Sequence, residues 1–496
     1  MKGLAKDTAI YGMSSIVGRL IGFLLTPMYV RYLSVDDNGS LVNTQALAAI
    51  WLVILIYGME TTFFRFMNKE EEKSTTVYPT ILTSIAITSV LFIFLCFSFS
   101  DPIATFLRFH GHADYIQLLA IVIGVDAFMT IPFAYLRHTK RPVRFATLKL
   151  INIFVNIGLN LFFLVACPEI HKSNPELISW FYNPEYGIGY VFASNAITSV
   201  ITLLLLLPHY TGFRYHFDGK LLKKMLNYAF PLLILSVAGV LNQAFDRFIF
   251  PYIYPGDESA RAQLGIYGQT AKIAVFLTMC VQAFRYAYEP FVFSQAKGKD
   301  NKASFAMAMK YFTIFALLGF LGVMFYLDIL KYILVEDYFE ALRVVPIIML
   351  GEIFFGIYFN LSIWYKLTDK TYFGAAFSTT GCVLIILINV LFIPTYGYMA
   401  CAWASFISNF VMMTLSYLFG RKHYPINYDM KSILFYFAIV LIIFFAGTYV
   451  NIDNLILRLA YRTGLLIIFV SIIVKRDFPL SEIPYINKFI KKKQTK

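Results

Sequence analysis

Fourteen apolar stretches divide this chain of 496 residues, and most of its charge lies in the short segments between them. Each stretch is close to the roughly 20 residues that a helix needs to cross the hydrocarbon layer of a membrane. Only helices and closed barrels satisfy every backbone hydrogen bond in lipid, and these stretches are far longer than barrel strands. The sequence therefore predicts an all-α polytopic membrane protein. We expect its 14 transmembrane helices near 8–32, 44–66, 77–99, 115–136, 146–167, 187–207, 226–251, 264–290, 305–327, 343–364, 374–393, 397–419, 432–450 and 456–474.

The composition excludes a water-soluble fold of this size. Hydrophobic residues make up 59% of the chain and charged residues only 14%, whereas a soluble domain carries about 25% charged residues. The five cysteines form no CxxC pair, and no Walker A sequence or metal-ligand spacing is present. We therefore expect no disulfide, no metal site and no cofactor.

Lysine and arginine gather in every second connection. The N-terminus, 67–76, 137–145, 208–225, 294–304, 366–373, 420–431 and the tail from 475 hold 27 of the 42, and the opposite set of connections holds 7. Because cytoplasmic loops attract Lys and Arg, both termini are predicted to lie in the cytoplasm. The net charge of +13 is then a topology signal, and its scatter over eight short segments argues against nucleic-acid binding. The basic tail 476–496 fits either a solvated end or a contact with anionic lipid headgroups.

The chain repeats itself weakly at an offset of 226–229 residues. Gly39 before span 2 corresponds to Gly265 before span 8, and Glu60 corresponds to Glu289. A repeat with the same direction in both halves predicts two lobes related by a pseudo-two-fold axis along the membrane normal, with a cavity between them. We expect an N-lobe at 1–210 (spans 1–6), a cytoplasmic linker at 211–225, a C-lobe at 226–424 (spans 7–12), spans 13 and 14 within 425–475, and the tail at 476–496.

Charged residues inside predicted spans are the candidate functional residues, because a charge in the bilayer usually faces a partner or a wet cavity. Arg19, in the middle of span 1, is the first candidate, since a guanidinium can hold a phosphate with two hydrogen bonds. The alternative is a structural ion pair between Arg19 and Glu60 or Asp126. Asn152, Asn156 and other polar residues of span 5 form a stripe that we interpret as helix-to-helix hydrogen bonding.

The whole chain resembles a known family of transporters. Fourteen spans, the repeat of six spans, the central Arg19, and Gly58-Met59-Glu60-Thr61 followed by Arg65-Phe66 at the end of span 2 carry the resemblance. They are similar to the polysaccharide transporter branch, the Wzx-type flippases, of the multidrug/oligosaccharidyl-lipid/polysaccharide exporter superfamily.

The resemblance implies a non-enzyme that moves an undecaprenyl-pyrophosphate-linked oligosaccharide across the bacterial cytoplasmic membrane by alternating access. Its partners would be that polyprenyl-linked glycan, membrane lipids and the polysaccharide polymerase machinery. The residues expected to contact the pyrophosphate are Arg19, Arg65, Arg247, Lys272 and Arg285. If an ion gradient drives transport, the acids expected to couple to it are Glu60, Asp126 and Glu352. An ion pair between Arg285 and Glu289, one turn apart, is the alternative for Arg285.

Three other functions are alternatives. A multidrug or cation antiporter keeps the fold, but the central Arg19 and the two extra spans argue against it. The lipid II flippase resembles a fourteen-span chain with more arginines in its first two helices than are present here. A membrane glycan polymerase or ligase resembles a protein with a large outer loop, whereas the longest outer connection here, 168–186, is short and holds Glu169 and His171 without a catalytic cluster.

Overall fold

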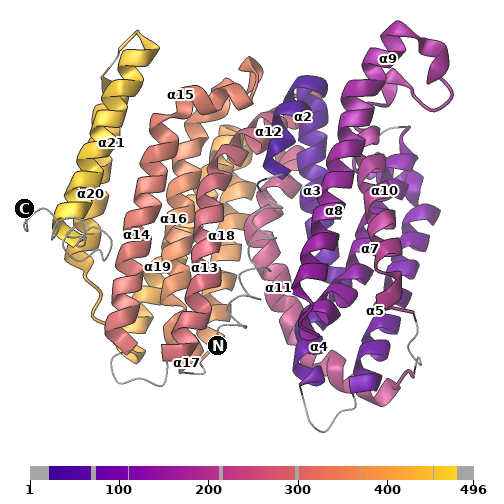
Figure 1. The fold of residues 1–496 in the computed structure, drawn as a ribbon, viewed down its shortest axis with the longest axis horizontal. Helices are drawn as coiled ribbons and strands as arrows, with labels where there is room; N and C mark the ends of the chain where they lie inside the picture. Colours follow the sequence, from indigo (N-terminus) through magenta and orange to yellow (C-terminus); the bar gives the residue numbers. More distant parts are fainter. Residues whose placement is uncertain are drawn as a thin grey trace, which may run out of the picture. The chain divides into compact units, whose positions relative to one another are not determined.

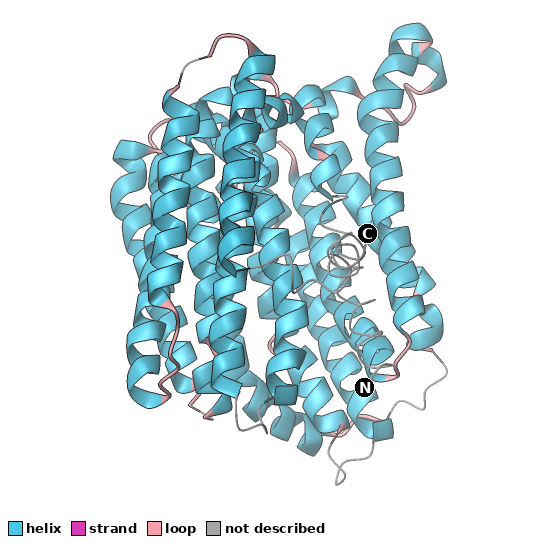
Figure 2. Ribbon diagram, turned by 60° about the vertical axis from the view of Figure 1, so that its left-hand side comes forward, coloured by secondary structure: helices cyan, strands magenta, loops and turns pink. Residues whose placement is uncertain are grey.

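The computed structural model describes residues 20, 22–68, 74–109, 111–211, 216–295, 301–368, 370–450 and 452–477. Within these ranges every element of regular secondary structure is a helix, and loops and turns join the helices (Figure 2). Twelve helices are long and apolar enough to cross a membrane, and Gly189–Leu205 is a shorter apolar helix. The prediction of an all-α membrane protein is confirmed. Most of the first predicted span lies outside the described residues, so the total of fourteen stays a prediction.

The chain forms two compact units. One comprises 1–269 and 378–404, and the other comprises 270–377 and 405–496. This division groups residues differently from the lobes that the repeat predicts, and the bounds of those lobes remain a prediction. Three helices contribute residues to both units: α12 (Asp257–Ala271), α18 (Tyr372–Tyr396) and α19 (Tyr398–His423).

In the first unit α7 is the central helix, and it packs against α3, α5 and α10 (Figure 1). Helix α11 packs along α3, and α10 packs against α8. The elements of this unit are α2 (Thr26–Tyr32), α3 (Val35–Ile56), α4 (Met59–Met67), α5 (Ser74–Ser98), α6 (Ser100–Phe106), α7 (Ala113–His138), α8 (Pro142–Leu161), the π-helical turn η1 (Phe162–Ala166), α9 (Cys167–Ser173), α10 (Gly189–Leu205) and α11 (Gly219–Ile253).

Side-chain caps fix where several of these helices begin. The Ser34 side chain accepts a hydrogen bond from the backbone N–H of Asp37 at 3.0 Å, which starts α3. The Asp218 carboxylate accepts from the N–H groups of Lys220 and Leu221 and starts α11. These hydrogen bonds, that of Leu221 first, hold the pKa of Asp218 below its usual value. Such caps satisfy N–H groups that have no partner within the helix.

Span 2 is broken in the middle. Helix α3 ends at Ile56, Tyr57 and Gly58 adopt left-handed backbone conformations with φ of 35° and 75°, and α4 begins at Met59. A β-carbon at Gly58 would lie 2.8 Å from the carbonyl oxygen of Ala229 on α11, so the break needs glycine for its close packing as well as for its φ. Irregular backbone at membrane depth is tolerated where it is buried in protein or lines a cavity.

In the second unit α14 packs against α13, α16, α20 and α21. Helices α20 and α21 are therefore held by α14, where Lys310 lies 3.3 Å from Asp429 and also pairs with Asp477. The elements of this unit are η5 (Lys272–Ala274), α13 (Val275–Gln295), α14 (Asn301–Phe325), α15 (Leu327–Leu330), η6 (Lys331–Ile333), η7 (Glu336–Val344), α16 (Val345–Leu361), α17 (Ile363–Leu367), α20 (Met430–Tyr449) and α21 (Leu455–Asp477).

Candidate functional site

A polar cavity of about 380 Å³ opens inside the first unit, next to the break in span 2. We call it the Glu60 cavity. Its walls come from α3, α4, α7, α8 and α10, and four of its lining residues carry charge. The lining residues are Leu52, Ile56, Glu60, Asp126, Met129, Thr130, Phe133, Arg137, Phe145, Lys149, Asn152 and Thr202.

Two acids and two bases face each other in the Glu60 cavity. Arg137 at the end of α7 forms an ion pair with Glu60 of α4, and its guanidinium carbon also lies 5.1 Å from the centre of the Phe64 ring. The Lys149 ammonium group lies 4.2 Å from the centre of the Phe133 ring. Because the four charges balance, the cavity is polar without being strongly cationic.

A second cavity of about 250 Å³ continues the polar path toward α2, and we call it the Asn156 cavity. Asp126 and Asn152 line both cavities and so lie where the two meet. The Asp126 carboxylate accepts a hydrogen bond from the Ser199 hydroxyl at 2.8 Å. A carboxylate is therefore held in the middle of a membrane helix between two spaces large enough for water.

The asparagine stripe of span 5 connects α8 to α10. Asn152 donates to the Thr202 hydroxyl at 2.9 Å, and Asn156 donates to the side-chain oxygen of Asn195 at 2.6 Å. The interpretation of this stripe as helix-to-helix hydrogen bonding is confirmed. Asn160, one turn further on, is fully buried and accepts from the Tyr29 hydroxyl at 3.3 Å.

At the opposite end of α3, glycines allow two helices to meet at backbone distance. A β-carbon at Gly39 would lie 1.8 Å from the carbonyl oxygen of Arg261, and one at Gly265 would lie 2.3 Å from that of Val35. A β-carbon at Gly268 would lie 2.5 Å from the Val42 side chain. We call this contact between α3 and α12 the glycine crossing. Gly39 and Gly265 are related by the sequence repeat, so equivalent positions of the two halves meet each other here.

Amide side chains form hydrogen bonds at the same end of α3. Gln269 donates to the side-chain oxygen of Asn38 at 2.5 Å, within the glycine crossing. Asn43 donates to the carbonyls of Arg247 and Phe248 on α11, each at 2.8 Å. Pro251 has no N–H, so the carbonyl of Arg247, four residues earlier, has no helical donor, and Asn43 replaces it.

The structure does not gather the five basic candidates into one described site. Arg19 and the side chain of Arg285 lie outside the described residues. Arg65 is exposed on α4, with its guanidinium carbon 4.1 Å from the centre of the Tyr228 ring. Arg247 lies near the other end of the first unit on α11, and Lys272 belongs to the second unit; both are half-buried.

Two of the three acidic candidates do lie together. Glu60 and Asp126 line the Glu60 cavity, while Glu352 lies half-buried on α16 in the second unit. The alternative that paired Arg19 with Glu60 has a competitor, because Arg137 already pairs with Glu60.

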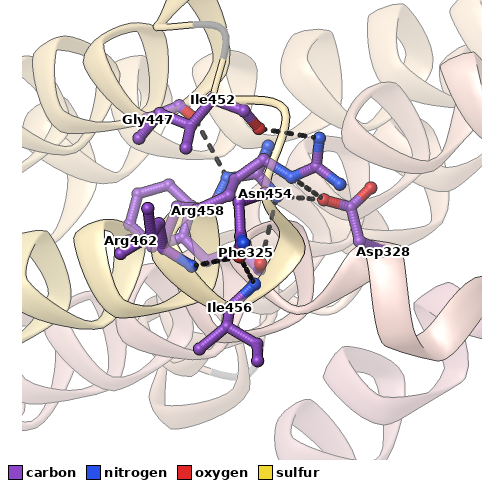
Figure 3. A network of polar contacts seen from close by, with 9 residues as sticks. Phe325, Asp328, Gly447, Ile452, Asn454, Ile456, Arg458 and Arg462 are labelled. Atoms are coloured by element: carbon purple, nitrogen blue, oxygen red, sulfur yellow. Dashed lines mark hydrogen bonds and ion pairs between the residues drawn. The ribbon is translucent and has the colours of Figure 1, made fainter.

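In the second unit, Arg458 and Arg462 of α21 both pair with Asp328 of α15 (Figure 3). Their Nε and Nη1 atoms lie 2.9 and 2.7 Å from the same carboxylate oxygen. Arg462 also donates to the carbonyls of Gly447 and Phe325 at 3.0 and 3.3 Å. Arg462, which the sequence places inside span 14, is thus a structural residue that joins α21 to α14 and α20.

The two bases of the Glu60 cavity, Arg137 and Lys149, are site residues that the sequence pattern does not predict. Arg137 lies in the basic connection 137–145, where it has the pattern of a cytoplasmic charge, and Lys149 lies among the polar residues of span 5. A lysine two turns into an apolar helix, followed by Asn152 on the same face, was the available signal. Within the described ranges no group of three His, Cys, Asp or Glu side chains could hold a metal ion.

Comparison with known proteins finds a matching family and solved structures with a similar fold. A family model described as polysaccharide biosynthesis protein matches residues 4–294. A protein of the Lsg locus of Haemophilus influenzae is 21% identical over 299 residues, which are 59% of this chain and 67% of that protein. The structure of the lipid II flippase MurJ in an inward closed conformation has a TM-score of 0.72 at 15% identity and covers 94% of this chain and 99% of that one.

A structure of the MATE multidrug transporter DinF-BH has a TM-score of 0.59 at 14% identity, over 87% of this chain and 96% of that one. At these identities the solved structures show a common fold. These two solved structures are those of a flippase and of a multidrug transporter. The chain belongs to the polysaccharide biosynthesis protein family, and it is a multi-pass membrane protein.

Proposed function

We propose that the protein flips an undecaprenyl-pyrophosphate-linked oligosaccharide from the inner to the outer leaflet of the bacterial cytoplasmic membrane. The observation that carries the proposal is the contrast along α3. One end of this helix is closed by the glycine crossing, and about 20 Å further along, at 1.5 Å per residue, Leu52 and Ile56 line a polar cavity. A transporter that alternates its access needs a closed end and a wet space reached from the other end.

The direction of closure follows from the predicted topology. With both termini in the cytoplasm, the N-terminus of α3 and the glycine crossing face outside, and the loop after Arg137 faces inside. The Glu60 cavity then starts at the inner interface and reaches the middle of the membrane at Asp126. This arrangement is the one expected before a headgroup is carried outward.

The pyrophosphate is the part of the cargo that needs protein charge, because a lipid tail stays in the bilayer and an oligosaccharide needs only polar surroundings. Arg65 supports this role, since it is exposed at the inner end of span 2 and its planar group rests on Tyr228. Arg19, Arg247, Lys272 and Arg285 remain candidates for later contacts along the path. A guanidinium suits a pyrophosphate because it donates two parallel hydrogen bonds.

Asp126 is the proposed coupling residue if an ion gradient drives the cycle. It lies where the two cavities meet, and it keeps one hydrogen bond, from Ser199, that does not need a cation. Glu60 is a weaker coupling candidate because Arg137 already neutralises it.

The test is made in the bacterium that carries the gene. Deletion of the gene is expected to raise lipid-linked oligosaccharide in membrane extracts and to remove the matching glycan from the cell surface, and a plasmid copy is expected to reverse both. Accumulation of lipid II instead would assign the cargo to peptidoglycan synthesis. Unchanged glycan with raised sensitivity to cationic drugs would replace the proposal by the antiporter function.

A further inference from the structure

An exposed aromatic patch lies on the connection between α9 and α10. Trp180 is 82% exposed and Leu177 is 64% exposed, and both belong to the segment 174–186, which we call the Trp180 hairpin. A contiguous patch of exposed apolar side chains marks a site of contact with another protein, a ligand or a membrane. The helix that precedes the hairpin indicates which partner this is.

Helices α8, η1 and α9 form one continuous helix of 32 residues, Pro142–Ser173. At 1.5 Å per residue it is about 48 Å long, well beyond the ~30 Å of the hydrocarbon layer. About 20 residues from the predicted start of span 5 near residue 146 are enough to cross that layer, which places its far edge near residue 166 and Phe162 one helical turn inside that edge. Helix α9, with Glu169 and Lys172, then stands beyond the membrane core, and it also stands beyond the end of α10 (Figure 1).

The Trp180 hairpin folds back from α9 to the level of Phe162. The ring of Phe181 stacks on that of Phe162 with centroids 6.2 Å apart and planes 8° apart. The Trp180 ring lies edge-on to Phe181 at 4.8 Å. Leu161 and Phe162 are themselves 46% and 41% exposed on the outside of the span, so the patch continues the lipid-facing surface of α8.

Contacts with α10 and α7 hold the Trp180 hairpin in place. Tyr182 stacks on Tyr190 of α10 at 5.1 Å, and the backbone N–H of Asn183 donates to the Tyr190 hydroxyl at 2.6 Å. The Tyr115 hydroxyl of α7 donates to the carbonyl of Tyr186 at 2.7 Å. Burial raises the pKa of Tyr182, which keeps this packed side chain neutral. The exposure of Trp180 is therefore a fixed feature of the fold and not a result of a loose loop.

We propose that the Trp180 hairpin is a membrane anchor, in which Trp180, Leu177 and Phe181 insert into the boundary between headgroups and acyl chains of the outer leaflet. Tryptophan is enriched at this depth because its ring is apolar and its N–H is polar. A glycan platform is the less favoured occupant, because the neighbours of Trp180 in the patch are apolar and continuous with the surface of the span. The anchor fixes the depth of the outer ends of α8 and α10.

The full-length protein, reconstituted in phosphatidylcholine vesicles, provides the test. The lipids carry bromine, which quenches tryptophan, either near the headgroup end or near the methyl end of their acyl chains. The emission that is lost in Trp180→Phe reports Trp180 alone. We expect this emission to be quenched more by the shallow bromine than by the deep bromine, and to be poorly quenched by iodide in the water.

Phe181→Ala removes the stack on Phe162 and is expected to weaken the quenching of Trp180 by shallow bromine. Phe106→Ala is the matched control, because Phe106 is also exposed and stacks on Tyr252 at 5.7 Å but is not part of the hairpin. The anchor is refuted if iodide quenches Trp180 fully and bromine in either position does not. Protection of Trp180 from iodide by a soluble oligosaccharide, without quenching by lipid bromine, would assign the patch to a glycan.

Discussion

The two ends of α3 are built in opposite ways. At its N-terminus the helix crosses α12 so closely that a β-carbon at Gly39 would lie 1.8 Å from a carbonyl oxygen, and no cavity separates the two backbones. Near its C-terminus the same helix lines a space of about 380 Å³ that holds Glu60, Asp126, Arg137 and Lys149. The first end is closed by tight backbone packing, and the second lines a cavity that holds ionisable side chains.

This difference separates two ways of making a membrane contact specific. Glycines let backbones approach within van der Waals distance, so the contact is strong only in one register and is lost on a small displacement. Charges in a cavity keep their water and their ion partners, so they tolerate displacement but need a polar surrounding. A transporter that opens one end and closes the other can use the first device as a seal and the second as a path.

Alanine at the glycine crossing has the largest expected effect. We expect Gly39→Ala or Gly265→Ala to force α3 and α12 apart at a cost of about 1–3 kcal/mol, which favours the open outer end by roughly 5- to 150-fold. Surface glycan should fall accordingly. A cysteine introduced by Val42→Cys, with Cys96 and Cys280 changed to serine, reports whether the crossing is open. In the Gly39→Ala variant it should become reactive toward an impermeant maleimide added outside.

Gly158→Ala is the matched control for this experiment. Gly158 lies in membrane helix α8, and a β-carbon there would meet nothing within 4 Å. Alanine at this position should keep transport and should gain up to about 1 kcal/mol of helix propensity. Equal labelling of Val42→Cys in the wild-type background and in Gly39→Ala would contradict the interpretation of the crossing as a closed seal.

Much of this fold was predictable, because spans and their order depend on apolar length, which is a local property of the sequence. The glycines were visible as a repeat, yet the contact between Gly39 and Gly265 was not, since it depends on how distant helices cross. The break at Tyr57 and Gly58 also escaped the sequence analysis, because the apolar run continues through it and only the left-handed backbone marks it.

The candidate site was predictable in its chemistry and not in its pairing. Glu60 and Asp126 were identified because a carboxylate inside an apolar run is unusual. That Arg137 is the partner of Glu60 could not be inferred, since the two residues lie on different spans and Arg137 reads equally well as a cytoplasmic charge. Lys149 and Asn152 share a helix face, but only the fold shows that this face lines a cavity.

Asp126→Asn tests the role of the Glu60 cavity, the open end of the comparison. Asparagine keeps the side-chain oxygen that accepts from Ser199, so the fold should be retained, but the side chain can no longer bind a proton or a cation at neutral pH. We expect flipping in vesicles to lose its response to a proton or sodium gradient. Flipping that never depends on either gradient, in the wild type, would remove the coupling role. Ser199→Ala, which leaves the carboxylate in place, should retain the response.

A double-mutant cycle on Glu60 and Arg137 measures how much their ion pair contributes to stability. Their side chains are 38% and 32% exposed, so the pair is partly screened by solvent, and we expect a coupling of about 1 kcal/mol in a double-mutant cycle. The cycle compares Glu60→Gln, Arg137→Gln and the double variant by thermal unfolding in detergent. Additive effects of the two single changes would mean that the ion pair does not stabilise the wall of the cavity.

The smallest effect is expected at two asparagines, Asn160 on α8 and Asn389 on α18, which lie 229 residues apart and so at the offset of the sequence repeat. Both side chains are fully buried. Asn160 donates to the carbonyl of Asn156 at 2.8 Å and accepts from the Tyr29 hydroxyl. In the described part of the chain, neither side-chain amide atom of Asn389 has a hydrogen-bond partner. Hydrogen bonds in membrane helices contribute about 0.6 kcal/mol on average, and an unpaired buried amide is unfavourable. Asn160→Leu should therefore lower the unfolding temperature, and Asn389→Leu should leave it unchanged or raise it. A loss of the same size in both variants would contradict the assignment of Asn389 as an unpaired buried amide.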